Sequence, residues 1–272
     1  MPELPEVETI RRYLNLSIVN ERIQKLEVLW AGSVVKAEPA DVYNLKNQKI
    51  NSIARKGKYL LFQLEDFDMV VHLRMTGQIY LNPQNPLEDH IRWVLYLQNG
   101  DKLYYRDVRK FGRLFLALKS QGARLSGLDK LGPEPWEITL EYWQDKLKSN
   151  RSIKLLLLDQ RVISGIGNIY ADEALFLAKI HPETKGKDLS SKQAAELLVA
   201  VRTVLDLGMR FGGTSFRDYV SGDGKKGNMQ EKLLVYQKDG QLCPRCTKHI
   251  EKIKVGGRSS HFCPICQLKP RR

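Results

Sequence analysis

The four cysteines of this chain are the feature that most limits how it can fold. They form two pairs, Cys243-Pro-Arg-Cys246 and Cys263-Pro-Ile-Cys266, with sixteen residues between the pairs. A C-x₂-C turn places two thiolates on one side of a tight knuckle, and two knuckles close a tetrahedral shell around Zn²⁺. The spacing therefore predicts a C-terminal ribbon with one structural zinc ion, ligated by Cys243, Cys246, Cys263 and Cys266.

The segment between the knuckles is basic. His249 and His261 also lie there, and either could serve as a ligand, but four cysteines already complete the shell. Cysteines confined to one metal site form no disulfide framework and favour a reducing cytoplasm. We expect the ribbon to present a basic finger to phosphates, the alternative being a merely solvated hairpin. The cations concerned are Arg245, Lys248, Lys252, Lys254 and Arg258.

The overall charge points to a polyanionic partner, or else to a basic solvated surface. Lys and Arg number 44 against 31 Asp and Glu, a net charge of +13 in 272 residues. That length suggests about two domains. Apolar runs such as Leu155 to Leu158 fall far short of the roughly 18 residues that a membrane span needs. The acidic N-terminus also does not match a secretory signal.

Hydrophobic periodicity divides the chain into a strand-rich part and a helical part. Val7, Ile10 and Leu14 form one apolar stripe and predict a short N-terminal helix. From about 20 to 117 we expect an antiparallel sandwich or barrel, with a hairpin at Asn99-Gly100. The clearest strand candidates are 58–64, 69–75, 92–97 and 102–106. After a break at 131–135, helices are expected at 140–147, 152–159, 168–177 and 191–210, with Gly212-Gly213 as a stop.

The first residues could carry chemistry, although an acidic first turn usually only caps a helix. Removal of Met1 would expose the secondary amine of Pro2, and an α-amino group has a pKa near 7.7–8.0. Such an amine can attack an electrophilic sugar carbon and form an iminium. Glu3 and Glu6 are spaced so that both can face the same pocket, where they could transfer protons.

Several motifs together resemble one known family. The chain begins Met-Pro-Glu-Leu-Pro-Glu-Val-Glu-Thr and ends in the cysteine ribbon, and matching segments occur in order between them. It closely resembles bacterial formamidopyrimidine-DNA glycosylase, a bifunctional glycosylase and AP lyase of base excision repair. The segments are 55–59, 72–77, 107–112, 131–135, 165–170 and 257–263.

The resemblance implies an α+β multidomain fold. It would comprise an N-terminal antiparallel β-sandwich with its helix (1–131), a helix–two-turns–helix domain (132–232) and a zinc ribbon (233–272). A loop at about 213–230 would cover the extruded base. The partner would be double-stranded DNA with oxidised purine or abasic lesions, bound by a cytoplasmic monomer with no membrane association.

Roles follow from the matching positions. Pro2 would be the nucleophile that attacks C1′, Glu3 the acid that protonates the opening sugar, and Glu6 an aid to positioning or proton transfer. The ammonium of Lys58 would bind the phosphate beside the lesion. Elimination of the 3′ and then the 5′ phosphate from the iminium would cut the strand without a catalytic metal.

The same resemblance assigns residues that handle DNA. A base must leave the stack before it can be attacked. Met75 would fill the vacated space, Phe111 would wedge beside the opposite strand, and Arg109 would bind the orphaned base. Asn168 and Arg258 would bind the DNA backbone together with Lys58. His72 and Lys154 match phosphate or lesion contacts. Many members carry Glu directly after the inserting Met, where this chain has Thr76.

Two alternatives remain open at this stage. The sister family endonuclease VIII acts on oxidised pyrimidines and shares Pro2, Glu3 and the ribbon, whereas Leu4 and the Arg109/Phe111 pairing look like the purine-specific branch. A non-enzymatic zinc-ribbon DNA-binding protein would explain the charge and the cysteines. It would give no role to Pro2 beside two carboxylates.

Overall fold

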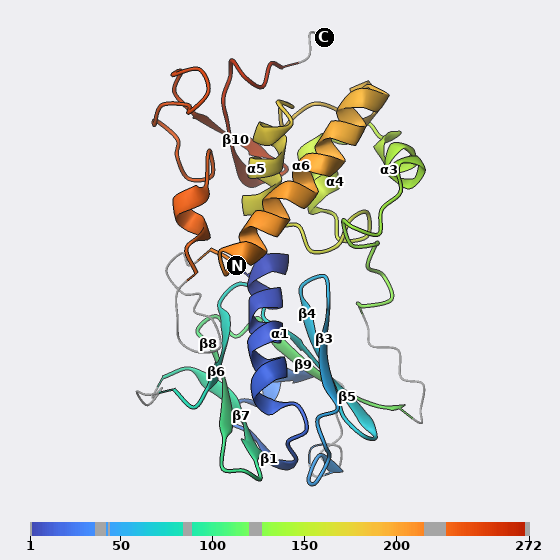
Figure 1. Ribbon diagram of the computed structural model, residues 1–272, viewed down its shortest axis with the longest axis vertical. Coiled ribbons are helices and arrows are strands. Elements are labelled where there is room, and N and C mark those ends of the chain that lie inside the picture. The colour runs from blue at the N-terminus through green and yellow to red at the C-terminus, as the bar shows by residue number, and fades with distance from the viewer. Residues whose placement is uncertain are drawn as a thin grey trace. The chain divides into compact units, whose positions relative to one another are not determined.

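The computed structural model describes residues 2–35, 42, 44–83, 89–119, 127–214 and 227–269. The chain forms two compact units (Figure 1). The first comprises Met1–Asp129 with Phe211–Gln230, and the second comprises Lys130–Arg210 with Glu231–Arg272. The first unit holds two β-sheets and the N-terminal helix, and the second holds helices and a C-terminal hairpin.

The N-terminal helix α1 (Leu4–Ile18) is placed by its apolar stripe. Val7, Ile10 and Leu14 are fully buried in the core of the first unit, as their spacing predicts. Pro5 lies in the first turn, where a missing N–H costs no helical hydrogen bond. In Figure 1 the helix, in blue, runs along the two sheets, and it packs on strands β3 (Ser52–Lys56) and β4 (Tyr59–Gln63).

The two sheets form the predicted sandwich around a shared apolar core. One has the order β1-β7-β8-β6, with bounds Ile23–Val28, Ile91–Leu97, Lys102–Asp107 and Gly77–Leu81. The other has the order β2-β9-β5-β4-β3, in which β2, β9 and β5 span Val34–Val35, Arg113–Leu118 and Phe67–His72. Pairing is antiparallel except that β2 runs parallel to β9, which the expectation of a purely antiparallel sheet did not include.

Turn chemistry sets where the strands end. Asn99 and Gly100 connect β7 to β8 as predicted, and Gly100 has a φ of +95°. The expected strand at 69–75 is too long, because β5 ends at His72 and the chain turns at Arg74, whose φ is +56°. Met75 therefore lies in a loop rather than on a strand.

The second unit contains the predicted helices. They are α3 (Leu140–Leu147), α4 (Ile153–Leu158), α5 (Asn168–Leu177) and α6 (Ser191–Arg210), of which α4 is one residue shorter at each end than expected. Strands β10 (Glu251–Val255) and β11 (Arg258–Phe262) form the C-terminal hairpin. Short 3₁₀ turns lie at Ala31–Ser33, Gly186–Asp188 and Met229–Lys232.

A buried carboxylate fixes the approach to the C-terminal hairpin. Glu173 of α5 accepts the backbone N–H groups of Leu234, Val235 and Tyr236 at 2.8–2.9 Å. Burial raises the pKa of Glu173, and the three N–H groups oppose that rise. The segment before the cysteines is therefore held on α5.

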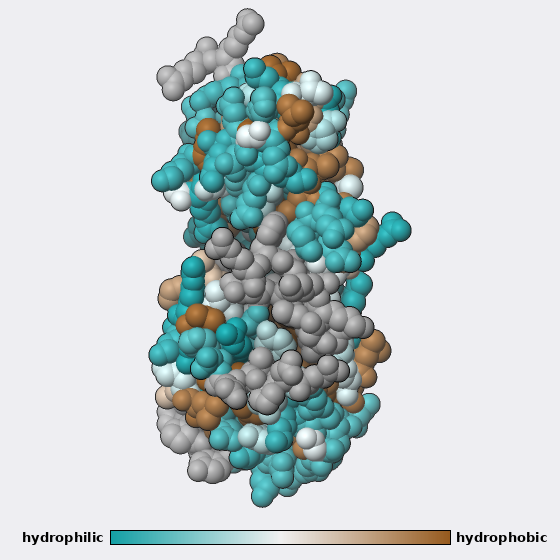
Figure 2. Space-filling view, turned by 90° about the vertical axis from the view of Figure 1, so that its left-hand side faces the viewer, coloured by the Kyte–Doolittle hydropathy of each residue, from teal (hydrophilic) through white to brown (hydrophobic). Residues whose placement is uncertain are grey.

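Apolar residues on the face in Figure 2 form small separate patches within a mainly hydrophilic surface. Within the described ranges, none of the helices has the length and hydropathy that would let it cross a bilayer.

Candidate functional site

The start of α1 gathers buried acidic groups. Pro2 is buried, and Glu3 and Glu6 are each only 1 % exposed. Glu3 is the N-cap, and its N–H donates to Oε2 of Glu6 at 2.8 Å. Oε1 of Glu6 accepts the N–H of Thr214 at 2.6 Å and its hydroxyl at 3.0 Å. Glu6 thus joins the first turn of α1 to a segment two hundred residues later in the sequence.

The base of the predicted capping loop is closed by backbone hydrogen bonds. The N–H of Asn228 donates to the carbonyl of Phe211 at 2.9 Å, and that of Met229 to the carbonyl of Gly213 at 3.1 Å. Gly213 has a φ of +78°, and a Cβ there would lie 2.8 Å from Oε1 of Glu6. The expected cap over the base falls on residues 215–226, which lie outside the described residues.

Lys58 lies at the tip of the β3–β4 hairpin and is 7 % exposed. Arg55 braces this tip, because its guanidinium donates to the carbonyl of Gly57 at 3.0 Å and to Glu8 of α1 at 3.0 Å. Helix α1 and the lysine hairpin are therefore joined by an ion pair.

Glu8 carries an unusual concentration of cationic partners. Burial opposes its ionisation, but hydrogen bonds from Arg11, Arg55 and Arg12 outweigh that effect and hold the pKa of Glu8 at about 2. The carboxylate accepts these bonds at 2.8–3.0 Å. Glu8 stays ionised at neutral pH and fixes the side of α1 that faces β3.

His72 is buried at the end of β5 and is neutral. Burial, followed by the positive charges of Arg74 and Lys58, lowers the pKa of His72 to about 3. Its Nδ1 accepts the N–H of Arg74 at 2.9 Å, which assigns the ring proton to Nε2. The ring centroids of His72 and Tyr59 lie 4.3 Å apart, and the two rings pack edge to face. The predicted phosphate or lesion contact of His72 would therefore be made by a neutral donor.

The structure places the three side chains that were expected to fill a void in DNA on two adjoining loops. Met75 lies in the loop between β5 and β6, whereas Arg109 and Phe111 lie in the loop between β8 and β9. Met75 is 42 % and Phe111 51 % exposed. The guanidinium of Arg109 lies 3.6 Å from the sulfur of Met75. These loops adjoin, and all three side chains reach the surface there.

In the second unit, Asn168 contacts the ribbon hairpin at the residue that follows Arg258. Asn168 is the first residue of α5, and its Nδ2 donates to the carbonyl of Ser259 at 2.9 Å. Its Oδ1 accepts no hydrogen bond from the described residues. Arg258 is exposed at the first position of β11, next to Ser259. The side chain of Asn168 thus fixes the tip of the ribbon against the N-terminus of α5, where backbone N–H groups favour anions.

Lys154, for which a phosphate or lesion contact is predicted, lies in the interior of the second unit. Its ammonium is fully buried, forms an ion pair with Asp172 of α5, and donates to the carbonyl of Asn168 at 3.2 Å. Asp172 also accepts the hydroxyl of Ser260 at 2.7 Å and the ring and backbone N–H of His261 at 3.0 Å. Lys154 therefore supports α5 and β11 from inside.

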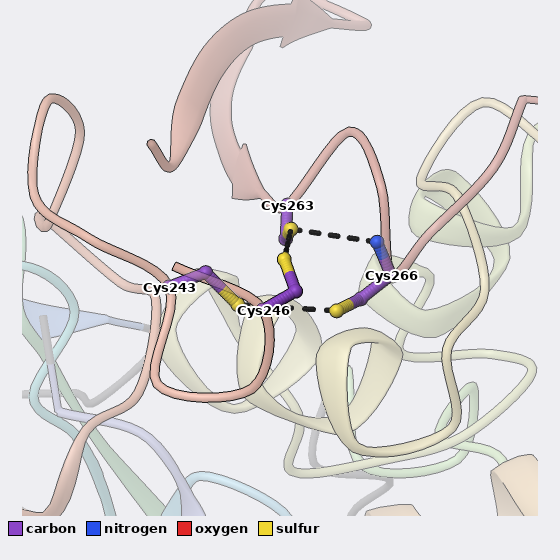
Figure 3. Close-up of side chains that lie close together, drawn as sticks. All are labelled: Cys243, Cys246, Cys263 and Cys266. Atoms are coloured by element: carbon purple, nitrogen blue, oxygen red, sulfur yellow. Dashed lines mark hydrogen bonds between the residues drawn. The ribbon is translucent and has the colours of Figure 1, made fainter. Parts of the chain in front are cut away.

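The four cysteine side chains converge from two loops (Figure 3). Their sulfur atoms all lie within 4.8 Å of one another, with Cys243 and Cys266 at 3.9 Å and Cys246 and Cys263 at 3.4 Å. A tetrahedral Zn²⁺ with bonds of about 2.3 Å requires sulfur separations of roughly 3.8 Å. The cysteines are unpaired, so the donor set fits one structural zinc ion.

The neighbouring histidines and Arg245 serve other purposes. His261 donates to Asp172, and His249 is exposed. Arg245 donates to the carbonyls of Phe176 and Leu177 at the end of α5, at 2.6 and 3.3 Å. A cation at a helix C-terminus is favourable, so Arg245 docks the ribbon on α5 rather than extending toward a partner.

Sequence reasoning did not identify Asp107 and Thr214 in the first unit, or Asp172 in the second, as residues that hold predicted site residues in place. Asp107 lies within a segment that the family resemblance had already marked, so that motif could have led to it. Asp172 and Thr214 carry no local signal, because their partners are distant in the sequence.

Comparison with known proteins identifies the class of protein to which this chain belongs. Three family models match in order: the formamidopyrimidine-DNA glycosylase N-terminal domain (residues 1–114), its H2TH domain (131–220), and a zinc finger found in FPG and IleRS (240–268). The fold and the cysteine site are thus those of a DNA glycosylase with a helix–two-turns–helix module and a zinc ribbon.

Whole-chain relatives narrow the class to one family. A formamidopyrimidine-DNA glycosylase of Cytobacillus firmus is 44 % identical over 98 % of this chain and 100 % of its own. A solved complex of a mutant Lactococcus lactis FPG with Fapy-dG-containing DNA has 40 % identity and a TM-score of 0.92, over 98 % of this chain and 100 % of that one. A complex of the Lactococcus lactis enzyme with abasic-site DNA has 40 % identity and a TM-score of 0.91, with the same coverage. This chain belongs to the formamidopyrimidine-DNA glycosylase family of base excision repair.

Proposed function

We propose that this protein excises oxidised purines from double-stranded DNA and then cuts the strand at the resulting abasic site, in the bacterial cytoplasm. The observation that carries the proposal is the buried start of α1, where Pro2 precedes two carboxylates that are each 1 % exposed. A short acidic turn that only capped a helix would need no such enclosure.

The chemistry uses the amine of Pro2 as the nucleophile. The nitrogen forms a bond to C1′ and loses its proton, the glycosidic bond breaks, and the base departs with the bonding electron pair and takes up that proton. Glu3 protonates the ring oxygen as the sugar opens to an iminium. Loss of a C2′ proton then expels the 3′ phosphate, and a second elimination expels the 5′ phosphate.

Glu6 acts as a positioning residue in this scheme. Its two oxygens already accept hydrogen bonds from Glu3 and Thr214, so it holds the first turn in register with the base of the capping loop. Lys58 places a cation at the hairpin tip, where it would neutralise the phosphate that the elimination releases.

Borohydride trapping on abasic-site DNA tests the proposal. The wild-type protein should form a covalent adduct that maps to its N-terminal peptide, and Pro2→Gly and Glu3→Gln should abolish excision while DNA binding is largely kept. Absence of an adduct from wild-type protein whose mass confirms removal of Met1 would refute the enzymatic assignment and favour a DNA-binding protein. Loss of binding in proportion to activity would contradict the two catalytic roles.

The β3–β4 hairpin offers a matched pair of lysines for the phosphate contact. Lys58 is buried at the tip, whereas Lys56 is exposed two residues earlier. Lys58→Gln should slow cleavage strongly, and Lys56→Gln should change only the salt-dependent binding. Equal effects of the two substitutions on cleavage would show that Lys58 contributes only as a general surface charge.

Lesion preference is tested separately. Excision from an 8-oxoguanine·C duplex should exceed excision from a thymine-glycol·A duplex. The reverse ranking would place the protein functionally with endonuclease VIII.

A further inference from the structure

Two loops cross between the sheets of the sandwich at the same end, and we call them the crossover loops. Residues 73–76 connect β5 to β6, and residues 108–112 connect β8 to β9. Gly77 pairs with Asp107, and His72 pairs with Arg113. The strand residues that flank one loop are thus paired with the strand residues that flank the other. This register places the two loops side by side.

One buried carboxylate binds both crossover loops. Asp107 is 1 % exposed, and its Oδ1 accepts the hydroxyl of Thr76 at 2.5 Å and the N–H of Arg109 at 3.2 Å. Its Oδ2 accepts the N–H of Gly112 at 2.7 Å and lies 3.4 Å from the hydroxyl of Tyr105. The same side chain therefore fixes both ends of its own loop and the last residue of the other.

The hydroxyl of Thr76 forms two hydrogen bonds that join the crossover loops. It donates to Asp107 and also accepts the N–H of Arg109 at 3.2 Å. The packing here is close, since a Cβ on Gly112 would lie 1.5 Å from the hydroxyl oxygen of Tyr105. Arg74 and Lys110 both have φ values near +60°, so each loop holds a left-handed residue in place.

We propose that Thr76 and Asp107 form a clasp that holds Met75, Arg109 and Phe111 in a preformed arrangement, and that this clasp sets the rate at which a damaged base is extruded. The inference rests on the function proposed above. Thr76 and Asp107 act as positioning residues, because they are buried below the exposed side chains that they align.

The physical reason is the cost of ordering the loops. Extrusion of a base costs a few kcal/mol of lost stacking and pairing, and side chains already aligned for the vacated space need not be ordered at that moment. Deletion of the Thr76 hydroxyl removes the hydrogen bond from Thr76 to the charged Asp107 and one of the two acceptors of the Arg109 N–H. Both of these hydrogen bonds join one crossover loop to residues of the other strand–loop segment, so their loss lets the loops separate. An abasic nucleotide has no base to extrude, and its cleavage depends less on the clasp.

Single-turnover rates on an 8-oxoguanine·C duplex and on an abasic-site duplex test this inference. One hydrogen bond to a charged partner corresponds to roughly tenfold in rate, so Thr76→Val should slow base excision about tenfold. It should change cleavage at the abasic site less than about twofold. Thr76→Ser keeps the hydroxyl and should match the wild type on both duplexes.

Tyr105→Phe is the matched control. It removes a different hydroxyl that faces the same carboxylate at the longer distance of 3.4 Å and belongs to neither crossover loop. Its ring stays stacked on Trp93, so the core is preserved. Tyr105→Phe should leave the ratio of the two rates unchanged.

Several outcomes would overturn the clasp. One is that Thr76→Val leaves the ratio of the two single-turnover rates unchanged, because both rates stay the same or fall equally. Another is that Thr76→Ser or Tyr105→Phe slows base excision as much as Thr76→Val does. Asp107→Asn combined with Thr76→Val should lose less than the sum of the single changes, and strict additivity would also count against it. Failure of the proposed function is distinguishable, because the wild-type protein would then trap no adduct at all.

Discussion

The ion pairs of Glu8 lead to a quantitative prediction about the first unit. Glu8→Gln removes the negative charge while it keeps the size of the side chain. The difference between the ordinary pKa of 4.5 and the value of about 2 in the folded protein corresponds to about 3 kcal/mol. Because Arg12 is 56 % exposed, solvent screening reduces the expected loss of stability to about 2 kcal/mol.

The pH dependence has a definite sign. The pKa of Glu8 is lower in the folded than in the unfolded protein, so its contribution is fully present above pH 4.5 and is lost as the pH falls toward 2. The wild type should therefore lose stability through this range, and Glu8→Gln should not show this part of the loss. The urea midpoints of the two proteins should differ at pH 6 and approach each other at pH 3.

Amide hydrogen exchange localises the effect. At neutral pH, peptides from α1 and the β3–β4 hairpin should exchange about thirtyfold faster in Glu8→Gln, the ratio that 2 kcal/mol implies. Peptides from α6 serve as the internal reference. Glu27→Gln is the control variant, because Glu27 pairs with Lys25 on the surface. Unchanged exchange in α1, or an equal change in α6, would refute the role assigned to Glu8.

Three further predictions address other parts of the molecule. Cys246→Ser should lose zinc and DNA binding together, and full zinc occupancy by elemental analysis would rule out the four-cysteine site. DNA affinity should fall steeply with salt because phosphate contacts supply it, so a flat titration would contradict that source of affinity. The ring resonances of His72 should stay fixed from pH 8 to pH 5, since burial holds its pKa at about 3; a titration near pH 6.5 would contradict its enclosure.

Features encoded by short contiguous patterns were predictable from the sequence. The stripe of Val7, Ile10 and Leu14 and the Asn99-Gly100 turn depend on residues only a few positions apart. The cysteine spacing likewise carries its own geometry, and the structure brings the four sulfurs together. In each case the local preference and the tertiary packing agree.

Features that depend on distant partners were not predictable. No local pattern in the sequence indicates that Thr214 donates a hydrogen bond to Glu6, which lies 208 residues away. The burial of Lys154 depends on Asp172 and on the position of β11, and no local pattern in the sequence indicates it. The parallel pairing of β2 with β9 involves two residues of each strand, too short a segment for periodicity to reveal.

The register of one sheet explains why the proposed DNA-handling groups gather at one end of the first unit. Tyr59 pairs with His72, and His72 pairs with Arg113, so these three residues form one row across β4, β5 and β9. Lys58 precedes that row in the β3–β4 turn, and both crossover loops leave from it. A slip of one residue in β5 would reverse the faces of its side chains and separate the loops. The register that places Phe67, Met69 and Val71 in the shared core therefore also determines where the exposed Met75 lies.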